Sequence, residues 1–144
     1  MSIFFQIVLI LLLVFPTIED VKTREIRNIY FLTIFLIKGI WLIVEKDRAI
    51  SSLVSLLIAA LIIFFCFLIS RGGMGKGDVK LLLAVAFYVE TELFLRGLLF
   101  TAIGSLLFSG FLLARKQISK KDELPFVPFI LFGNVVSTLF EVIK

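Results

Sequence analysis

Long apolar runs, separated by short charged clusters, limit the folds that are open to this chain. A helix needs roughly 20 predominantly apolar residues to cross a hydrocarbon core of about 30 Å. Read against the charges, the runs give six candidate spans, at residues 2–18, 28–44, 50–69, 79–89, 93–114 and 126–143. The sequence therefore predicts an all-α, polytopic membrane protein with six transmembrane helices.

The composition supports this placement in a bilayer. Hydrophobic residues make up 60% of the 144, and 17 of them are Phe, which is more apolar surface than a soluble domain of this length could bury. The sequence contains no internal repeat and no linker long enough to separate two domains. We expect one integral-membrane domain over residues 1–144.

The residue types that are absent narrow the chemistry. The sequence has no His and a single Cys, Cys66, which lies inside an apolar run and is best explained as a packing residue. Without His the chain can form neither a Ser-His pair nor a zinc site of two His on one helix. Carboxylate chemistry remains open, and it requires no metal and no cofactor, so we expect none.

The distribution of basic residues predicts an orientation. The net charge of +4 could suggest a nucleic-acid partner, but the Lys and Arg residues lie in the loops between the runs, so we expect none. If the N-terminus is outside, ten basic residues lie on the inner side and four near the outer face, as the positive-inside rule requires. We expect a multi-pass protein of the plasma membrane, surrounded by lipid, with both termini outside. Asp20, Asp78 and Pro125 then share the cytoplasmic side.

The strongest local signal is Gly72-Gly73-Met74-Gly75-Lys76-Gly77-Asp78, four glycines directly before an acid that opens an apolar run. Glycine permits positive φ and the close approach of another backbone, so an extended substrate could lie against Gly75 and Gly77. The run from Asp78 to Glu90 is only about 18 Å long as a helix, which places Asp78 below the inner interface. The alternative is an ordinary turn with Asp78 as N-cap. A nucleotide-binding loop is excluded, because no strand precedes the motif and the Gly-Lys spacing is wrong.

A second acidic segment, Glu19-Asp20, follows the first apolar run and makes Asp20 the candidate partner of Asp78. Glu19 competes for this role, but it lies about 100° away around a helix, so only one of the two acids can face the interior. Two carboxylates that share one proton can hydrolyse an amide: the ionised one takes a proton from water, and the protonated one polarises the carbonyl. Lys76 and Lys80 would oppose this arrangement, so we expect them to face away from the acids.

A third segment, Leu124-Pro125-Phe126-Val127-Pro128-Phe129, enters the last run. Pro125 and Pro128 delay helix formation and leave backbone amides and carbonyls free near the predicted site, although a simple Pro-initiated helix start explains the composition equally well. Two further charged residues within the runs, Lys38 and Glu141, lie nearer the outer side, where they could pair with each other.

These three segments together resemble the prepilin peptidases, or type IV leader peptidases. Gly75-Lys76-Gly77-Asp78 is similar to the family's Gly-x-Gly-Asp motif. Asp20, followed eight residues later by Asn28, resembles its first-aspartate segment, although this chain has Arg27 where the family usually has Pro. Leu124 to Phe129 resembles its Pro-Phe segment, and the resemblance covers nearly the whole chain.

The resemblance implies an intramembrane aspartyl endopeptidase that removes short basic leaders from pilin-like precursors at the cytoplasmic face. Asp20 and Asp78 would be its catalytic residues, and Gly75, Gly77, Pro125, Phe126 and Pro128 its substrate-binding or structural motif residues. Members that also N-methylate their product carry paired Cys-x-x-Cys zinc ligands in an extra domain. A chain with Cys66 alone is therefore expected to be the short, peptidase-only form.

Two other functions remain open on the sequence. A small transporter or channel subunit could use Asp78 beside a broken helix as an ion site, but its ionisable groups should then lie near the midplane, not at one face. A non-catalytic pilin-assembly partner would not need both aspartates. The sequence leaves the precursor and the oligomeric state undetermined.

Overall fold

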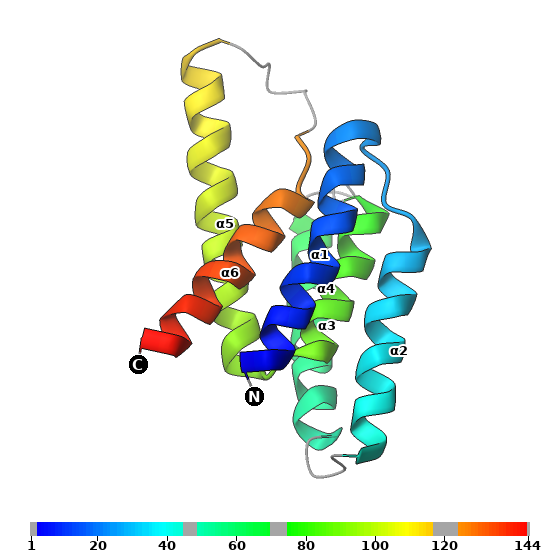
Figure 1. The fold of residues 1–144 in the computed structure, drawn as a ribbon. Helices are drawn as coiled ribbons and strands as arrows, with labels where there is room; N and C mark the ends of the chain where they lie inside the picture. Colours follow the sequence, from blue (N-terminus) through cyan, green and yellow to red (C-terminus); the bar gives the residue numbers. More distant parts are fainter. Residues whose placement is uncertain (1–2, 45–48, 70–74, 117–123, 144) are drawn as a thin grey trace.

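The computed structural model describes residues 3–44, 49–69, 75–116 and 124–143. Its six helices are α1 (Ile3–Thr23), α2 (Asn28–Val44), α3 (Ala49–Ile69), α4 (Lys76–Tyr88), α5 (Thr91–Ala114) and α6 (Val127–Ile143) (Figure 1). The all-α prediction is confirmed for this part of the chain. Two boundaries differ from the prediction: α1 continues past residue 18 to Thr23, and α4 begins at Lys76 instead of residue 79. The apolar pattern ends where the charges begin, whereas both helices extend beyond it into the neighbouring charged residues.

The described helices differ in whether they can cross a membrane by length. Three are long and apolar enough, namely α1, residues 49–66 of α3, and α5. α2 and α6 are apolar but have only 17 residues each. α4 has 13 residues, or about 20 Å of helix. Helix length alone therefore supports three spans.

α4 lies at the centre of the bundle, with α2 and α3 packed against it (Figure 1). Six of its residues are buried, on several sides of the helix: Leu81, Leu82, Ala84, Val85, Ala86 and Tyr88. A helix that is apolar all round is stable only when other helices enclose it. The bundle therefore fixes the position of α4, and with it the position of Asp78 in its first turn.

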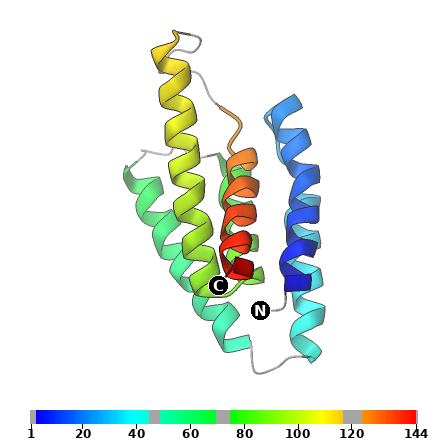
Figure 2. The same ribbon diagram turned by 60° about the vertical axis from the view of Figure 1, so that its left-hand side comes forward.

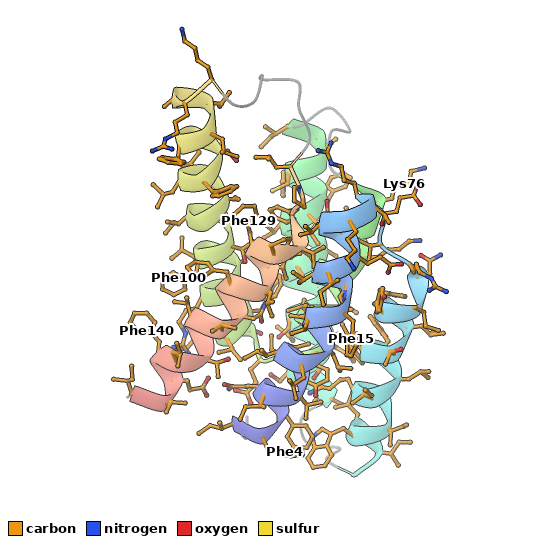
Figure 3. All side chains as sticks on the ribbon, turned by 45° about the horizontal axis from the view of Figure 1, so that its top comes forward. Phe4, Phe15, Lys76, Phe100, Phe129 and Phe140 are labelled. Carbon is orange, nitrogen blue, oxygen red and sulfur yellow. The ribbon has the colours of Figure 1, made fainter. Side chains whose placement is uncertain are left out.

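The outside of the bundle is strongly apolar. Phe4 and Phe15 of α1 point away from the other helices and are 65% and 63% exposed (Figure 3). Exposed Leu, Ile and Phe side chains also cover α3 and α5. A surface of this kind fits a lipid environment and not an aqueous one.

α5 and α6 cross at close range, and small residues permit this contact (Figure 2). A Cβ on Gly133 of α6 would collide with the carbonyl oxygen of Gly97 and with the side chain of Thr101, both on α5. Phe100 and Phe140 stack beside the crossing, with ring centroids 5.4 Å apart (Figure 3). This contact sets the direction of α6 and therefore the place where α6 begins.

The C-terminal end of α1 and the N-terminal ends of α4 and α6 meet at one end of the bundle, shown at the top of Figure 1. The described ends of the chain lie at the opposite end. In both views α5 extends past the other helices on the side where α1 ends (Figures 1 and 2). The end of α1 and the starts of α4 and α6, which are distant in sequence, are thus brought together at this end.

Candidate active site

Asp20 and Asp78 line the same cavity. Asp20 lies in the last turn of α1 and Asp78 in the first turn of α4. The cavity has a volume of about 320 Å³, and its described lining consists of Asp20, Arg24, Glu25, Ile26, Gly75, Lys76, Gly77 and Asp78. The structure therefore brings together the two acids that the sequence predicted to be partners. The same cavity also contains Arg24 and Ile26, which the sequence did not single out.

Asp20 is buried, with 5% of its surface exposed, and its carboxylate has a defined partner. The backbone N–H of Val127 donates a hydrogen bond to Asp20 Oδ2, at 3.0 Å between nitrogen and oxygen. Val127 is the first residue of α6, 107 residues away in the sequence. A helix N-terminus attracts negative charge, so the start of α6 is a suitable partner for this carboxylate oxygen.

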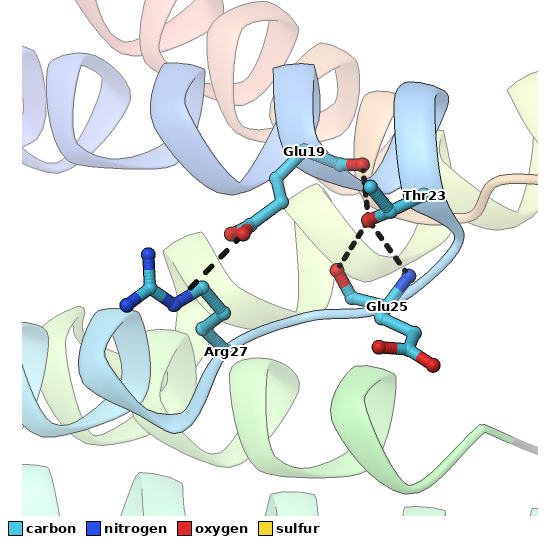
Figure 4. A network of polar contacts seen from close by, with 4 residues as sticks. All are labelled: Glu19, Thr23, Glu25 and Arg27. Carbon is cyan, nitrogen blue, oxygen red and sulfur yellow. Dashed lines mark hydrogen bonds and ion pairs between the residues drawn. The ribbon is translucent and has the colours of Figure 1, made fainter.

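Glu19 faces a different direction from Asp20. Its carboxylate forms an ion pair with Arg27, with 4.0 Å between Oε1 and Nε (Figure 4). The hydroxyl of Thr23 donates to the carbonyl oxygen of Glu19 at 3.0 Å and lies 3.3 Å from that of Glu25. Within the described residues Glu19 does not line the cavity. The one-residue offset on α1 thus separates the two acids, and Asp20 is the one that faces Asp78.

Asp78 is the third residue of α4, and its carboxylate turns back over Gly75. The N-cap position is Gly75, so the interpretation of Asp78 as N-cap is wrong. Asp78 Oδ2 lies 2.7 Å from the position that a Cβ on Gly75 would occupy. Gly75 has φ −61° and ψ 134°, an ordinary extended backbone, so it is needed for space and not for a positive φ.

Gly77 also serves the close approach of a neighbour, which comes from the chain itself. The side chain of Ile26, in the connection between α1 and α2, lies 3.0 Å from the position of a Cβ on Gly77. The expected approach of a substrate backbone is therefore not required to explain this glycine. The two glycines of the motif let the first-aspartate segment and Asp78 pack against each other.

The pKa of Asp78 is raised from 3.8 to about 6. The main cause is removal of the carboxyl group from water, and the neighbouring charge of Asp20 adds to it. Asp78 lies one residue before the fourth predicted span, residues 79–89. Burial and like-charge repulsion therefore both favour a proton on Asp78.

The two lysines of the motif behave differently. Lys80 reaches away from the acids and donates a hydrogen bond from Nζ to Asn28 Oδ1 at 2.8 Å, which links α4 to the start of α2. Lys76 is exposed and is among the residues that line the cavity, and the expectation that its side chain faces away from the acids stays a prediction. Its position follows from the start of α4, which begins at Lys76 and places the whole first turn beside the cavity.

The Pro-Phe segment reaches the site through its backbone. Pro125, Phe126 and Pro128 are half-buried, and they do not belong to the described lining of the cavity. The residue that contacts Asp20 is Val127, whose apolar side chain gave no functional signal in the sequence. The contact is made by a backbone amide, which every residue except proline carries, so no signal in the sequence could have indicated it.

The acid and base expected near the outer side lie at the end of the bundle away from Asp20. Glu141 accepts a hydrogen bond from Gln6 Nε2 of α1 at 2.8 Å. Lys38 lies over the ring of Tyr88, with 5.9 Å from Nζ to the ring centroid. α1 and α6 thus share polar contacts at both ends, through Gln6 and Glu141 here and through Asp20 and Val127 at the cavity.

Fold and site together define a helical membrane protein with a pair of carboxylates in a cavity at one end of its bundle. Comparison with known proteins gives the family: the sequence matches the type IV leader peptidase family over residues 7–140, and the chain belongs to that family. The chain is also similar to the prepilin leader peptidase/N-methyltransferase of Bacillus subtilis (strain 168), with 24% identity over 143 residues. This alignment covers 97% of the chain and 57% of that relative. No solved structure matches the chain.

Proposed function

We propose that this protein is an aspartyl endopeptidase that removes short leader peptides from pilin-like precursors. The observation that carries the proposal is that Asp20 and Asp78 line one cavity. Membership of the type IV leader peptidase family and the name of the Bacillus subtilis relative support this substrate class. The chain itself supplies two carboxylates whose surroundings differ, which is the arrangement that acid-base hydrolysis of an amide needs.

The surroundings of the two acids support different roles. Asp20 accepts the N–H of Val127 at the positive end of α6, so we assign it as the base. Asp78 has a raised pKa of about 6, so we assign it as the protonated acid.

Hydrolysis then proceeds in two steps. Asp20 takes a proton from a water molecule, whose oxygen attacks the scissile carbonyl carbon, while Asp78 gives its proton to the carbonyl oxygen. The tetrahedral diol collapses when Asp20 returns its proton to the leaving nitrogen and Asp78 takes a proton from a diol oxygen. The C–N bond breaks, and both acids recover their starting forms.

The proposal includes a topology. We propose six spans with both termini outside and the cavity at the cytoplasmic face of the plasma membrane. Basic residues near the cavity end support this orientation: Lys22, Arg24, Arg27, Lys76, Lys80, Arg115 and Lys116. α5 extends past the neighbouring helices at this end, so Asp20 and Asp78 would lie below the level of its basic end (Figure 1). A leader would be cut there while the apolar helix of the precursor stays in the bilayer.

The test is co-expression with a pilin-like precursor, with leader loss followed by mass. Asp20→Asn and Asp78→Asn should each reduce cleavage by at least about 1,000-fold, because Asn cannot exchange a proton. Glu19→Gln is the matched control, since it changes the adjacent acid that points away from the cavity, and it should keep most of the activity. Cleavage by Asp20→Asn with loss in Glu19→Gln would overturn the assignment of Asp20. A parent that cuts no tested precursor would favour a non-catalytic partner.

A further inference from the structure

The start of α6 has an unusual hydrogen-bond pattern. The first N–H groups of a helix have no partner within it and must find one elsewhere. The N–H groups of Phe129 and Ile130 both donate to the carbonyl oxygen of Phe126, at 3.0 and 3.3 Å. Pro128 has no N–H. Of the first four positions of α6, only Val127 therefore keeps a donor for another part of the protein.

That donor is directed at Asp20. The contact is buried, the distance is 3.0 Å, and Val127 itself has no exposed surface. A hydrogen bond from a backbone amide to a buried carboxylate is charge-assisted and costly to lose. It occupies Oδ2 of Asp20, so Oδ1 remains available to a water molecule in the cavity. The start of α6, with Pro128 at its second position, thus offers one amide to one carboxylate oxygen.

From this geometry we infer that Val127 is a positioning residue, whose backbone N–H holds the carboxylate of Asp20 oriented for proton transfer. The inference rests on the proposed function and goes beyond it, because it gives the Pro-Phe segment a role that involves no contact with the substrate. α6 is itself fixed by its close crossing with α5 at Gly133 and by the contact between Gln6 and Glu141. The amide is therefore held on a rigid element.

The matched pair of variants is Val127→Pro and Val127→Ala. Proline removes the N–H at the first helical position, where its ring is compatible with a helix, whereas alanine keeps the N–H and removes most of the side chain. We expect kcat to fall by about 10- to 100-fold in Val127→Pro with KM changed less than about twofold, because a charge-assisted hydrogen bond contributes about that factor. Val127→Ala should retain most of kcat. Equal kcat in the two variants would overturn the inference and leave the proposed function standing.

A second variant covers the case in which proline perturbs the helix start. Incorporation of the α-hydroxy analogue of valine at position 127 replaces the N–H by an ester oxygen and keeps the side chain. The ester should lower kcat in the same way as Val127→Pro. Unchanged kcat in a folded ester variant would contradict the role of the N–H.

Thermal unfolding in detergent tests the contact even if no precursor is cut. Val127→Pro should lower Tm in the parent and lower it less in an Asp20→Ala background, because the partner of the N–H is then already missing. Equal decreases in the two backgrounds would show that the N–H does not interact with Asp20. If the parent cuts no precursor, the result counts against the proposed function. Equal decreases of Tm in the two backgrounds count against the role of the Val127 N–H.

Discussion

The carboxylate of Asp78 lies over Gly75, with Oδ2 2.7 Å from the position that a side chain on Gly75 would occupy. This contact predicts that Gly75→Ala displaces the carboxylate of Asp78, because the added methyl and the oxygen cannot share the space. We expect kcat to fall by about tenfold or more with little loss of folded protein. Leader loss per unit of purified enzyme is the measurement, and parent-like kcat would contradict the role of Gly75.

Gly77→Ala should act in a different way. Its added methyl would meet Ile26 at 3.0 Å, in the connection between α1 and α2. The neighbour is an apolar side chain and not the reacting carboxylate, so we expect a loss of stability of about 1 kcal/mol or more, seen as a lower Tm. Activity per folded molecule should fall less than in Gly75→Ala. The reverse ranking of the two variants would show that Gly77, not Gly75, controls the position of the acid.

The raised pKa of Asp78 predicts the alkaline limb of the pH profile. If Asp78 must be protonated, kcat/KM should increase as the pH falls from 8, reach half of its maximum near pH 6, where the pKa lies, and level off at lower pH. Cleavage rates in buffers of constant ionic strength give this profile, and a rate that keeps rising up to pH 8 would exclude Asp78 as the acid.

The same shift predicts that Asp78→Asn stabilises the folded protein. The pKa of Asp78 is about 6 in the folded state against 3.8 for an ordinary Asp, so above pH 6 the folded state holds a charge that it disfavours. Asn removes this cost, which we put at about 1 kcal/mol after screening by water in the cavity. Tm should be higher in the variant at pH 8, and the difference should shrink as the pH falls toward 4. A difference in Tm that does not vary with pH would show that the charge of Asp78 is not its cause.

The close crossing of α5 and α6 predicts that Gly133→Ala strongly lowers the stability of the protein, whereas Gly110→Ala changes it little. Gly133→Ala would place a methyl against the backbone of Gly97 and separate the two helices, with a loss of about 2 kcal/mol or more. Gly110→Ala is the control, because a Cβ there meets nothing within 4 Å and alanine favours a helix. Tm values in detergent measure both, and similar values for the two variants would contradict the crossing.

The sequence determined the helical class, the approximate position of each helix and the identity of the acids that share a site. Runs of apolar residues leave few alternatives to a helix in lipid, because every backbone group must be satisfied within the segment. The basic clusters predicted that Asp20 and Asp78 lie on the same side, and the structure places both in one cavity. These properties depend on composition and order along the chain, which can be read without coordinates.

Only the tertiary structure decided which of two neighbouring acids faces the cavity, what the motif glycines accommodate and which group holds Asp20. Glu19 and Asp20 are chemically similar, and the rotation of α1 against α4 and α6 separates them. Ile26 meets Gly77 because the connection between α1 and α2 folds over the start of α4. The partner of Asp20 is a backbone amide, which every residue except proline carries, so no side-chain pattern could identify Val127. Such contacts between distant segments depend on helix packing, which a sequence pattern does not record.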